Sequence, residues 1–379
     1  MGGCGGGGAT GTAGIQTVNA PVPVPAPTPS PVPTPTPAAT SAATQTLAAV
    51  AATSLGFVPA TAARSTAGIT LPLGKCINVD GDLDMPLGGN PSWPTITNND
   101  FARIRAAGFQ SVRLPVRWAV HASSTAPYTI DPKFIASVRT QIDQARMNRL
   151  NVIIDLHYFD QAATDPVGQT PRLTALWKQI GYALSYYPSA NAFSNVWFQL
   201  MNEPNTITPD QLAALLKPAL AAVRTTNPTR PVIIGGTRYS AVESLDTLVL
   251  PDDPYVVPEF HFYNPMEFTH QGAPWVPGAE KTGVTYGSTT DVAQLNWYVK
   301  QVKAYMTKTG RVPIMGEYGA IVLASAGDRA KFIGASSAAF ASIGVQGCVW
   351  DYGGQWFNIW NSTGWRGQEF SAIQTTVSL

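Results

Sequence analysis

The sequence is poor in charged residues, and its N-terminal part has none. Asp, Glu, Lys and Arg make up 12% of the 379 residues, against roughly 25% in a typical globular domain. The first charged residue is Arg64. The net charge of +1 and the pI of about 7.7 do not give the concentrated basic surface that phosphate binding requires. These values argue against a nucleic-acid partner and fit a neutral polymer better than a phosphorylated one.

Histidine and cysteine are also scarce, which limits the metal and disulfide chemistry of the chain. There are four histidines and three cysteines. The spacings His-x-His, Cys-x-x-Cys and His-Glu-x-x-His, which are typical of zinc sites, are all missing. Three cysteines are too few for a disulfide framework. We therefore expect a protein without a metal ion or another cofactor.

No hydrophobic run reaches the length of about 18 residues that a membrane-spanning helix needs. The N-terminal part is instead rich in proline, which occupies every second position from Pro21 to Pro37. Proline fixes φ and donates no backbone hydrogen bond, so such a segment is an extended spacer without a core. We expect residues 1–66 to be a flexible Gly-rich tail and Pro-rich linker, and residues 67–379 to form the folded domain that it tethers.

The opening residues MGGCGGGG have neither the charged nor the apolar region of an intact signal peptide. Small residues before Cys4 and glycines after it are typical of the start of a bacterial lipoprotein, in which Cys4 would carry the lipid. A flexible tail with an incidental thiol explains the same residues. We expect a secreted protein or one at the bacterial cell surface, and both interpretations of Cys4 stay open.

From residue 67 onward, short β-branched or apolar runs alternate with longer segments of helical period. Several helical segments carry start and stop signals, such as Thr208 before Pro209 at one start and Gly310 at one end. Eight runs are expected to be strands: 75–79, 111–118, 151–158, 196–203, 231–236, 256–263, 312–319 and 345–353.

This alternation predicts a (β/α)8 TIM barrel. An open, doubly wound sheet is the alternative. It would favour a glycine-rich phosphate loop after the first strand, and the stretch NVDGDLDMPLGG lacks the G-x-G-x-x-G spacing.

The carboxyl ends of the strands are where a (β/α)8 barrel places its active site. In this sequence those ends carry polar or aromatic side chains within otherwise apolar runs. Asp155 and Glu259 lie two residues deeper along their strands and are expected to support the residues above them. The two-residue alternation of a strand places Glu259, His261 and Tyr263 on one face. The candidate residues at the strand ends are Arg113, His157, Asn202, Glu203, His261, Tyr263, Glu317 and Trp350.

Glu203 and Glu317 end the fourth and seventh predicted strands, which face each other across the mouth of a barrel. Two carboxyl groups that flank a bond are what glycoside hydrolysis needs, since one delivers a proton to the leaving oxygen and the other attacks or positions water. Arg113 and Tyr263 are suitable partners to keep one carboxylate ionised. The plainer alternatives are a strand-end salt bridge for the glutamates and structural roles for the histidines and the arginine.

The eight strand-end residues, in this order, resemble the signature of glycoside hydrolase family 5, the cellulase-type retaining glycosidases. The motifs MNEPN, HFYNP, GEYG and VWDYG fall in register with that signature. The resemblance implies that Glu203 is the acid/base and Glu317 the nucleophile of a double displacement with retention. It also implies that Asn202 binds the sugar 2-hydroxyl, while Arg113 and Tyr263 orient Glu317 and keep it ionised.

The same resemblance implies that His157 and His261 line the subsites at the cleaved bond and that Trp350 stacks beneath the adjacent sugar. The peptide bond from Trp350 to Asp351 is expected to be cis. The third strand ends in HYFD and the first reads CINVDGD, which both depart from the usual pattern of the family. Tyr158 is the candidate to fill the position after the histidine. These departures concern substrate preference and leave the chemistry unchanged.

The sequence has ten tryptophans, whose flat rings could stack on the apolar faces of sugar rings. Among the loop residues we favour Trp275, in the long loop after the sixth strand, and Trp356. His270 in the same long loop is a further candidate. Tryptophans within predicted helices or strands are expected in the core, namely Trp177, Trp197 and Trp297.

Cys76 and Cys348 fall on the first and eighth predicted strands, which are neighbours once the barrel closes. A disulfide between adjacent strands is geometrically demanding. We therefore expect two buried thiols.

These observations predict a monomeric, retaining endo-β-1,4-glucanase that acts on cellulose or a related β-glucan. A β-mannanase, an exo-β-glucanase or a β-glucosidase are alternatives within the family, because subsite loops distinguish them and the catalytic set does not. A non-catalytic carbohydrate-binding barrel is the alternative of another class. It would be marked by the loss of a glutamate, and both are present.

Overall fold

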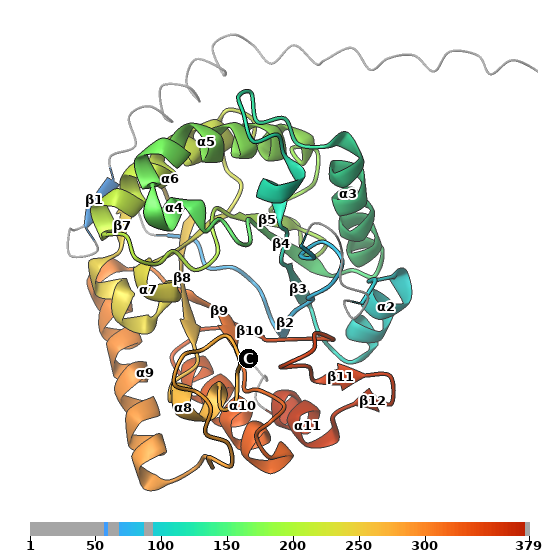
Figure 1. The fold of residues 1–379 in the computed structure, drawn as a ribbon, viewed down its shortest axis with the longest axis vertical. Helices are drawn as coiled ribbons and strands as arrows, with labels where there is room; N and C mark the ends of the chain where they lie inside the picture. Colours follow the sequence, from blue (N-terminus) through green and yellow to red (C-terminus); the bar gives the residue numbers. More distant parts are fainter. Residues whose placement is uncertain (1–56, 60–67, 87–93, 376–379) are drawn as a thin grey trace, which may run out of the picture. The chain divides into compact units, whose positions relative to one another are not determined.

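The computed structural model describes residues 57–59, 68–86 and 94–375. Within them, eight parallel strands close into a barrel in the order β10-β2-β3-β4-β5-β6-β8-β9, and Figure 1 shows helices arranged around these strands. The predicted (β/α)8 barrel is therefore confirmed. Its strands are β2 (Cys76–Asn78), β3 (Ser111–Leu114), β4 (Asn151–Asp155), β5 (Val196–Gln199), β6 (Val232–Gly235), β8 (Val256–Phe262), β9 (Ile314–Tyr318) and β10 (Gly347–Val349).

Most of the barrel strands end earlier than the apolar runs that predicted them. The run 196–203, for example, forms β5 only as far as Gln199. The rest of the run leaves the ladder, so Asn202 and Glu203 lie in the loop beyond the strand. This shortening matters for function because it places polar side chains above the closed sheet.

The longer helices lie between the strands, as the sequence predicted, and the segment from β6 to β8 has only short elements. One small antiparallel pair joins β1 (Phe57–Pro59) to β7 (Val249–Pro251), so these residues of the expected flexible segment 1–66 are ordered; the others lie outside the described residues. No described helix is both long and apolar enough to cross a membrane. The helices and remaining short elements are α2 (Asn98–Ala106), η1 (Trp118–His121), α3 (Pro132–Met147), α4 (Gln161–Thr164), α5 (Pro166–Ala183), α6 (Pro209–Arg224), α7 (Thr237–Ser240), η2 (Val242–Thr247), α8 (Met266–Thr269), α9 (Thr289–Thr309), α10 (Ala326–Ala341), β11 (Trp360–Asn361), β12 (Gly364–Trp365) and α11 (Gly367–Thr375).

Local chemistry explains where these helices begin and end. The Thr208 side chain accepts a hydrogen bond from the backbone N–H of Gln211, and Pro209 occupies the first position of α6. Helix α9 ends at Gly310, whose φ of 67° lies in the left-handed region that favours glycine. Both signals had been read correctly from the sequence.

One tryptophan assignment was wrong. Trp177 and Trp197 are buried as expected, but Trp297 is 48% exposed. The buried stripe of α9 includes Leu295, Tyr298 and Val302, spaced three and four residues apart, and Trp297 falls beside this stripe.

The floor of the barrel is a small hydrophobic cluster separate from the main core between strands and helices. It contains Ile153, Trp197, Ile233, Val257 and Ile314, with Cys76 and Cys348 among them. A packed floor leaves the carboxyl ends of the strands as the open end of the barrel.

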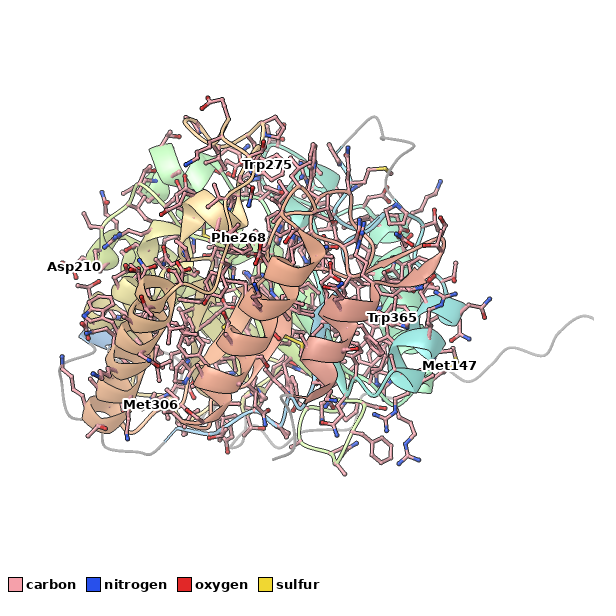
Figure 2. All side chains as sticks on the ribbon, turned by 90° about the horizontal axis from the view of Figure 1, so that it is seen from below. Met147, Asp210, Phe268, Trp275, Met306 and Trp365 are labelled. Atoms are coloured by element: carbon pink, nitrogen blue, oxygen red, sulfur yellow. A yellow bond between two sulfur atoms is a disulfide. The ribbon has the colours of Figure 1, made fainter. Side chains whose placement is uncertain are left out.

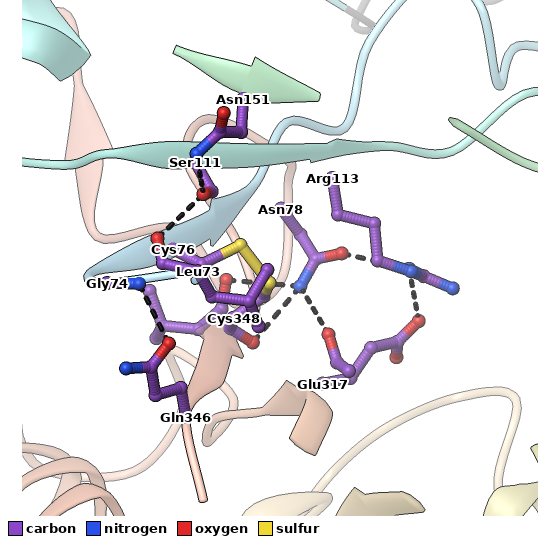
Figure 3. The surroundings of a disulfide bond; sticks show 12 residues. Leu73, Gly74, Cys76, Asn78, Ser111, Arg113, Asn151, Glu317, Gln346 and Cys348 are labelled. Carbon is purple, nitrogen blue, oxygen red and sulfur yellow. Dashed lines mark hydrogen bonds and ion pairs between the residues drawn. A yellow bond between two sulfur atoms is a disulfide. The ribbon is translucent and has the colours of Figure 1, made fainter. Parts of the chain in front are cut away.

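Cys76 and Cys348 form a disulfide, which corrects the expectation of two thiols. The strands β2 and β10 close the barrel in a register that sets the two cysteines directly opposite each other, with their Cα atoms 4.2 Å apart. Both side chains belong to the hydrophobic floor, and Figure 3 shows the bond between them. The sequence placed the cysteines on adjacent strands but could not give this register.

Candidate active site

The two glutamates predicted to carry the chemistry converge at the open end of the barrel. Glu203 follows β5, Glu317 lies within β9, and His261 lies in β8 between them. One ligand atom from each of the three lies within 4.8 Å of the others. One oxygen of each carboxyl group is thus within the separation of roughly 5–5.5 Å found in retaining glycosidases, and closer than the roughly 6.5–9.5 Å of inverting ones.

Arg113 lies beneath this pair and organises its surroundings. The side chain is completely buried, and its nitrogens contact five oxygens, four through hydrogen bonds and one, on Asp155, as an ion pair. Its partners are Gln199 Oε1 at 2.7 Å from Nε, Asn78 Oδ1 and Glu317 Oε1 at 2.8 Å each from Nη1, and Asn202 Oδ1 at 2.7 Å and Asp155 Oδ2 at 2.6 Å from Nη2.

The carboxylate of Glu317 is buried and lies next to the positive charge of Arg113. Its side chain is only 6% exposed, and Tyr263 Oη donates a hydrogen bond of 3.0 Å to its Oε2. Burial, followed by the charges of Glu317 and Glu203, raises the pKa of Tyr263 well above its usual value, so the phenol remains a donor. The predicted contacts of Arg113 and Tyr263 with Glu317 are therefore both present.

Glu203 is more open to solvent, with 28% of its side chain exposed. Nδ1 of His261 lies 2.7 Å from Glu203 Oε1 and 3.5 Å from Glu317 Oε2, so one ring nitrogen stands between the two carboxylates. Burial alone would lower the pKa of His261, but the charge of Glu317, the hydrogen bond to Glu203 and the carboxylate of Glu259, 3.6 Å from Nε2, raise it to about 10.

Burial has the opposite effect on Glu203, whose pKa it would raise. The hydrogen bond from His261 and the charges of His261, His157 and Arg113 outweigh burial and lower the pKa. At neutral pH, His261 is therefore protonated and its Nδ1–H donates to an ionised Glu203. The pair holds one exchangeable proton next to the proposed point of cleavage.

His157 and Asn202 present hydrogen-bond donors to the cavity. Burial would lower the pKa of His157, but the charges of Asp155 and Asp84 and a 2.8 Å hydrogen bond to Asp155 raise it to about 9. Its Nε2 then carries a proton and cannot accept from the Asn202 amide 3.4 Å away. Because Arg113 occupies the Asn202 oxygen, the amide N–H groups remain for a ligand.

Two adjoining cavities open at this end of the barrel. The first has a volume of about 310 Å³ and the second about 660 Å³. Figure 2 shows Trp275 at the end of the barrel opposite Met306, which lies in the last turn of α9. Arg113 lies below the first cavity and His261 lines the second. The other predicted residues all line the first: His157, Tyr158, Asn202, Glu203, Tyr263, His270, Trp275, Glu317, Trp350 and Trp356.

Flat aromatic rings surround the first cavity. The ring of Trp350 lies parallel to that of His157, with centroids 5.9 Å apart and an interplanar angle of 6°. Trp275 and Trp356 meet edge to face at 5.2 Å. Such rings are suited to contact the apolar faces of sugars. The peptide bond from Trp350 to Asp351 is cis, as expected.

A family model described as cellulase (glycosyl hydrolase family 5) matches residues 81–355. The chain belongs to glycosyl hydrolase family 5. It is therefore a glycoside hydrolase, as the sequence motifs predicted.

Curated relatives of this family 5 enzyme, and solved structures of proteins similar to it, support the same family. Endoglucanase H of Acetivibrio thermocellus is 32% identical over 283 residues, which cover 74% of this chain but only 30% of that protein. Endoglucanase C of the same species is 25% identical over 70% of this chain and 86% of its own length. The Thermotoga maritima Cel5A, solved with mannotriose and with cellobiose, has a TM-score of 0.75 at 30% identity and covers 79% of this chain and 97% of its own.

The sequence reading of this family 5 enzyme missed two residues that hold Arg113. Gln199 accepts from Nε and itself donates to Glu259. Asn78 accepts from Nη1, while its amide donates to carbonyl oxygens of the adjacent strands β9 and β10, as Figure 3 shows. Each is a single polar residue inside an otherwise apolar strand, and that was the only signal that could have revealed it.

Glu203, His261 and Glu317 also have the spacing to ligate a metal ion. Two positive charges already occupy the neighbourhood, however, since Arg113 lies 2.8 Å from Glu317 and His261 is protonated. A divalent cation would be repelled by both, whereas a neutral sugar would not. The arrangement therefore fits proton transfer and nucleophilic attack better than metal binding.

Proposed function

We propose that this chain is a retaining endo-β-1,4-glucanase, with Glu317 as nucleophile and Glu203 as acid/base. The observation that carries the proposal is the close approach of the two carboxyl groups, with one His261 nitrogen between them. The environments differ in the way the two roles demand. Glu317 is dry and bonded to Arg113 and Tyr263, while Glu203 is exposed enough to exchange protons with water.

The reaction follows from these positions in two steps. First, an oxygen of Glu317 bonds to the anomeric carbon, the bond from that carbon to the glycosidic oxygen breaks, and the leaving oxygen takes a proton from Glu203. Then Glu203 takes a proton from water, whose oxygen attacks the anomeric carbon and releases Glu317 as a carboxylate. Two successive inversions give net retention.

His261 links the nucleophile to the acid. The charge of Glu317 is the strongest influence that raises the pKa of His261. As Glu317 bonds to the sugar, that charge disappears and the imidazolium holds its proton less tightly. The proton in the His261–Glu203 hydrogen bond then shifts toward Glu203, so the acid gains its proton as the leaving oxygen needs it.

The remaining predicted residues bind the sugar. Asn202 and His157 each offer an N–H donor to the first cavity, which suits Asn202 to the 2-hydroxyl next to the reacting carbon. Trp350 supplies the platform beneath that sugar, while Tyr158, Trp275 and Trp356 border the cleft.

A β-glucan is the substrate that the relatives favour, since the two curated relatives compared here are named endoglucanases. Internal cleavage is supported by cavities on both sides of Glu203, because sugars can then bind on both sides of the broken bond. β-Mannanase activity is the second candidate, and the mannotriose complex of the Thermotoga maritima protein favours it.

The test is product analysis on carboxymethylcellulose, cellohexaose and mannan. We expect a rapid fall in the viscosity of carboxymethylcellulose, internal cleavage of cellohexaose and newly formed ends that are initially β. Release of glucose from chain ends only, preference for mannan, or α ends would each contradict a part of the proposal. Glu203→Gln and Glu317→Gln are the matched inactive controls.

We further propose that the enzyme works as a monomer outside the reducing cytoplasm. The disulfide between Cys76 and Cys348 supports export, since such bonds are rare in reducing compartments. Cys4 lies outside the described residues, so its lipid attachment stays a prediction that mass spectrometry of the native protein would test. Light scattering tests the monomer, and recovery from the cytoplasm with both barrel cysteines reduced would contradict export.

A further inference from the structure

At the end of the barrel opposite the active site, exposed aromatic and arginine side chains gather on one surface. This surface is formed by the C-terminal half of α3, which leads into β4, and by the loop of residues 184–195, which leads from α5 into β5. Trp197 of the barrel floor donates its indole N–H to the carbonyl of Ser189 in this loop, at 3.0 Å. Figure 2 shows Met147 of α3 well away from Trp275 at the open end. We call the following residues the floor patch: Arg139, Arg146, Met147, Arg149, Tyr186 and Phe193.

The floor patch exposes three large apolar side chains. Met147 is 69% exposed, Tyr186 is 62% exposed and Phe193 is 43% exposed. Two arginines lie against the rings: Cζ of Arg149 is 4.0 Å from the ring centre of Phe193, and Cζ of Arg139 is 5.5 Å from that of Tyr186. A guanidinium that stacks on a ring keeps its N–H donors free to bind a phosphate. The patch therefore offers apolar rings and cationic donors side by side.

The loop that carries the two rings is fixed to the barrel by hydrogen bonds. Nη2 of the buried Arg230 donates to three carbonyl oxygens in the first part of the loop, the shortest bond being 2.8 Å to Tyr187. At its other end, the Ser194 carbonyl accepts from Nε of Arg146 at 2.9 Å, and the Ser194 hydroxyl donates to the Arg146 carbonyl at 2.9 Å. The exposed rings are thus held in place before any partner binds, which lowers the entropic cost of binding.

Charge distinguishes the partners that such a surface could bind. Residues 139–149 contain three arginines and one acid, Asp143, while the loop 184–195 has no charged residue. The patch is therefore positively charged on a chain that is nearly neutral overall. A second copy of the chain would set like charges against each other, which is unfavourable. A neutral β-glucan would use the rings but not the charge, whereas an anionic surface uses both.

The chain also enters the barrel at the floor end. Strand β1 pairs with β7, which ends shortly before β8 begins. The backbone N–H of Ile69 donates a 2.9 Å hydrogen bond to the carbonyl of Pro254, and Leu73 belongs to the cluster that forms the floor. The segment that precedes residue 57 therefore joins the barrel at the same end as the floor patch. A lipid on Cys4 would hold this end of the barrel to a membrane.

We propose that the floor patch docks the enzyme on the surface of a membrane that contains anionic lipids. The arginines bind the lipid phosphates, while Met147, Tyr186 and Phe193 enter the boundary between head groups and acyl chains. In this orientation the open end of the barrel faces away from the membrane, where a polymer can reach Glu203 and Glu317. Binding through the patch requires no lipid on Cys4 and does not depend on which glycan the enzyme cleaves.

The test is sedimentation of the full chain with lipid vesicles. The chain carries Cys4→Ser, so that no lipid can be attached at this position. One set of vesicles contains equal parts phosphatidylglycerol and phosphatidylcholine, and the other contains phosphatidylcholine alone. We expect binding to the first set only, and a smaller bound fraction at high salt, because salt screens the attraction between the arginines and the lipid phosphates.

Variants then locate the binding surface. Arg149→Gln removes one exposed charge and should weaken binding by about fivefold. Tyr186→Ser combined with Phe193→Ser removes both rings and should weaken binding by about tenfold or more. Trp297→Ser and Lys303→Gln, which change exposed residues of α9 outside the patch, are the matched controls and should bind as the wild type does. All variants should keep the wild-type kcat on an aryl β-cellobioside, which shows that they are folded.

Equal binding to both sets of vesicles, no binding to either, or wild-type affinity in the patch variants would overturn the proposal. Sedimentation with insoluble cellulose, in a Glu317→Gln background, tests the substrate as partner. If the patch variants lose cellulose binding and keep vesicle binding, the patch binds glycan instead. Light scattering that shows a dimer only when the patch is intact would assign it to a second copy. None of these measurements needs hydrolysis, so their failure leaves the proposed function intact, and an enzyme that cleaves no β-glucan leaves the docking surface intact.

Discussion

Replacing Arg113 by lysine keeps a positive charge beside Glu317 but removes the planar fork that organises the site. The guanidinium contacts five oxygens from Nε, Nη1 and Nη2, whereas an ammonium has only three donors. At least two buried acceptors therefore lose their partner. Hydrogen bonds to charged groups contribute about 1.5–3 kcal/mol each, so the free energy of unfolding should fall by about 3–6 kcal/mol.

Activity should fall as well, because a lysine that reaches Asp155 cannot also hold Glu317 in place. A displacement of the nucleophile by about 1 Å is enough for a loss near 100-fold, so we expect kcat to fall by that order while KM changes little. Urea unfolding and steady-state kinetics on an aryl β-cellobioside measure the two effects. Arg105→Lys is the matched control: its side chain is exposed and donates a hydrogen bond to the Phe109 carbonyl, so the change should be within about 1 kcal/mol. Wild-type kcat in Arg113→Lys would refute the reasoning.

Three further predictions concern the disulfide between β2 and β10, the Asn78 side chain, and the two histidines. Replacing Cys76 and Cys348 together by serine should lower the free energy of unfolding by about 2–5 kcal/mol because the bond closes a loop of 272 residues, while kcat per folded molecule stays the same; a large drop in kcat would show that the disulfide shapes the site. Asn78→Ala should lower kcat without changing KM, because Arg113 loses a partner that ties it to β9 and β10, and a variant that is only less stable would contradict this. Because the pKa values of His157 and His261 are raised to about 9 and about 10, their protonation stabilises the fold below about pH 6.5, and this contribution is lost as the pH rises through 9 to 10. The unfolding temperature should therefore fall as the pH rises from about 6.5 to about 10. An increase over this pH range would contradict the raised pKa values of the two histidines.

The fold could be predicted because its information is local and repeated. Alternating apolar and helical runs with capping residues, such as Thr208 before α6, determine the strand order once a barrel is assumed. The candidate active-site residues could be selected because a charged or amide side chain at the end of an apolar run needs a reason to be there. Glu203 and Glu317, which the structure brings together, were selected in this way.

What could not be predicted depends on three-dimensional register or on backbone geometry. Asn78 and Gln199 are ordinary strand residues until Arg113 is placed between them. The bond between Cys76 and Cys348 depends on how the last strand meets the first. The left-handed turn at Tyr239 in α7, whose φ is 59°, has no sequence signal, because the residues Thr-Arg-Tyr-Ser contain no glycine or asparagine to indicate a positive φ.

The central claim is that Glu317 forms a covalent bond with the sugar, while Glu203 donates a proton in the first step and accepts one in the second. The reagent is a β-cellobioside with fluorine at C2 and a good leaving group. The fluorine slows both steps, but the leaving group keeps the first step faster than the second, so the covalent intermediate accumulates. Digestion and mass spectrometry then locate the sugar. We predict a single adduct on the peptide that contains Glu317. A sugar attached to Glu203, or turnover of cellohexaose with inversion and without any adduct, would contradict the account.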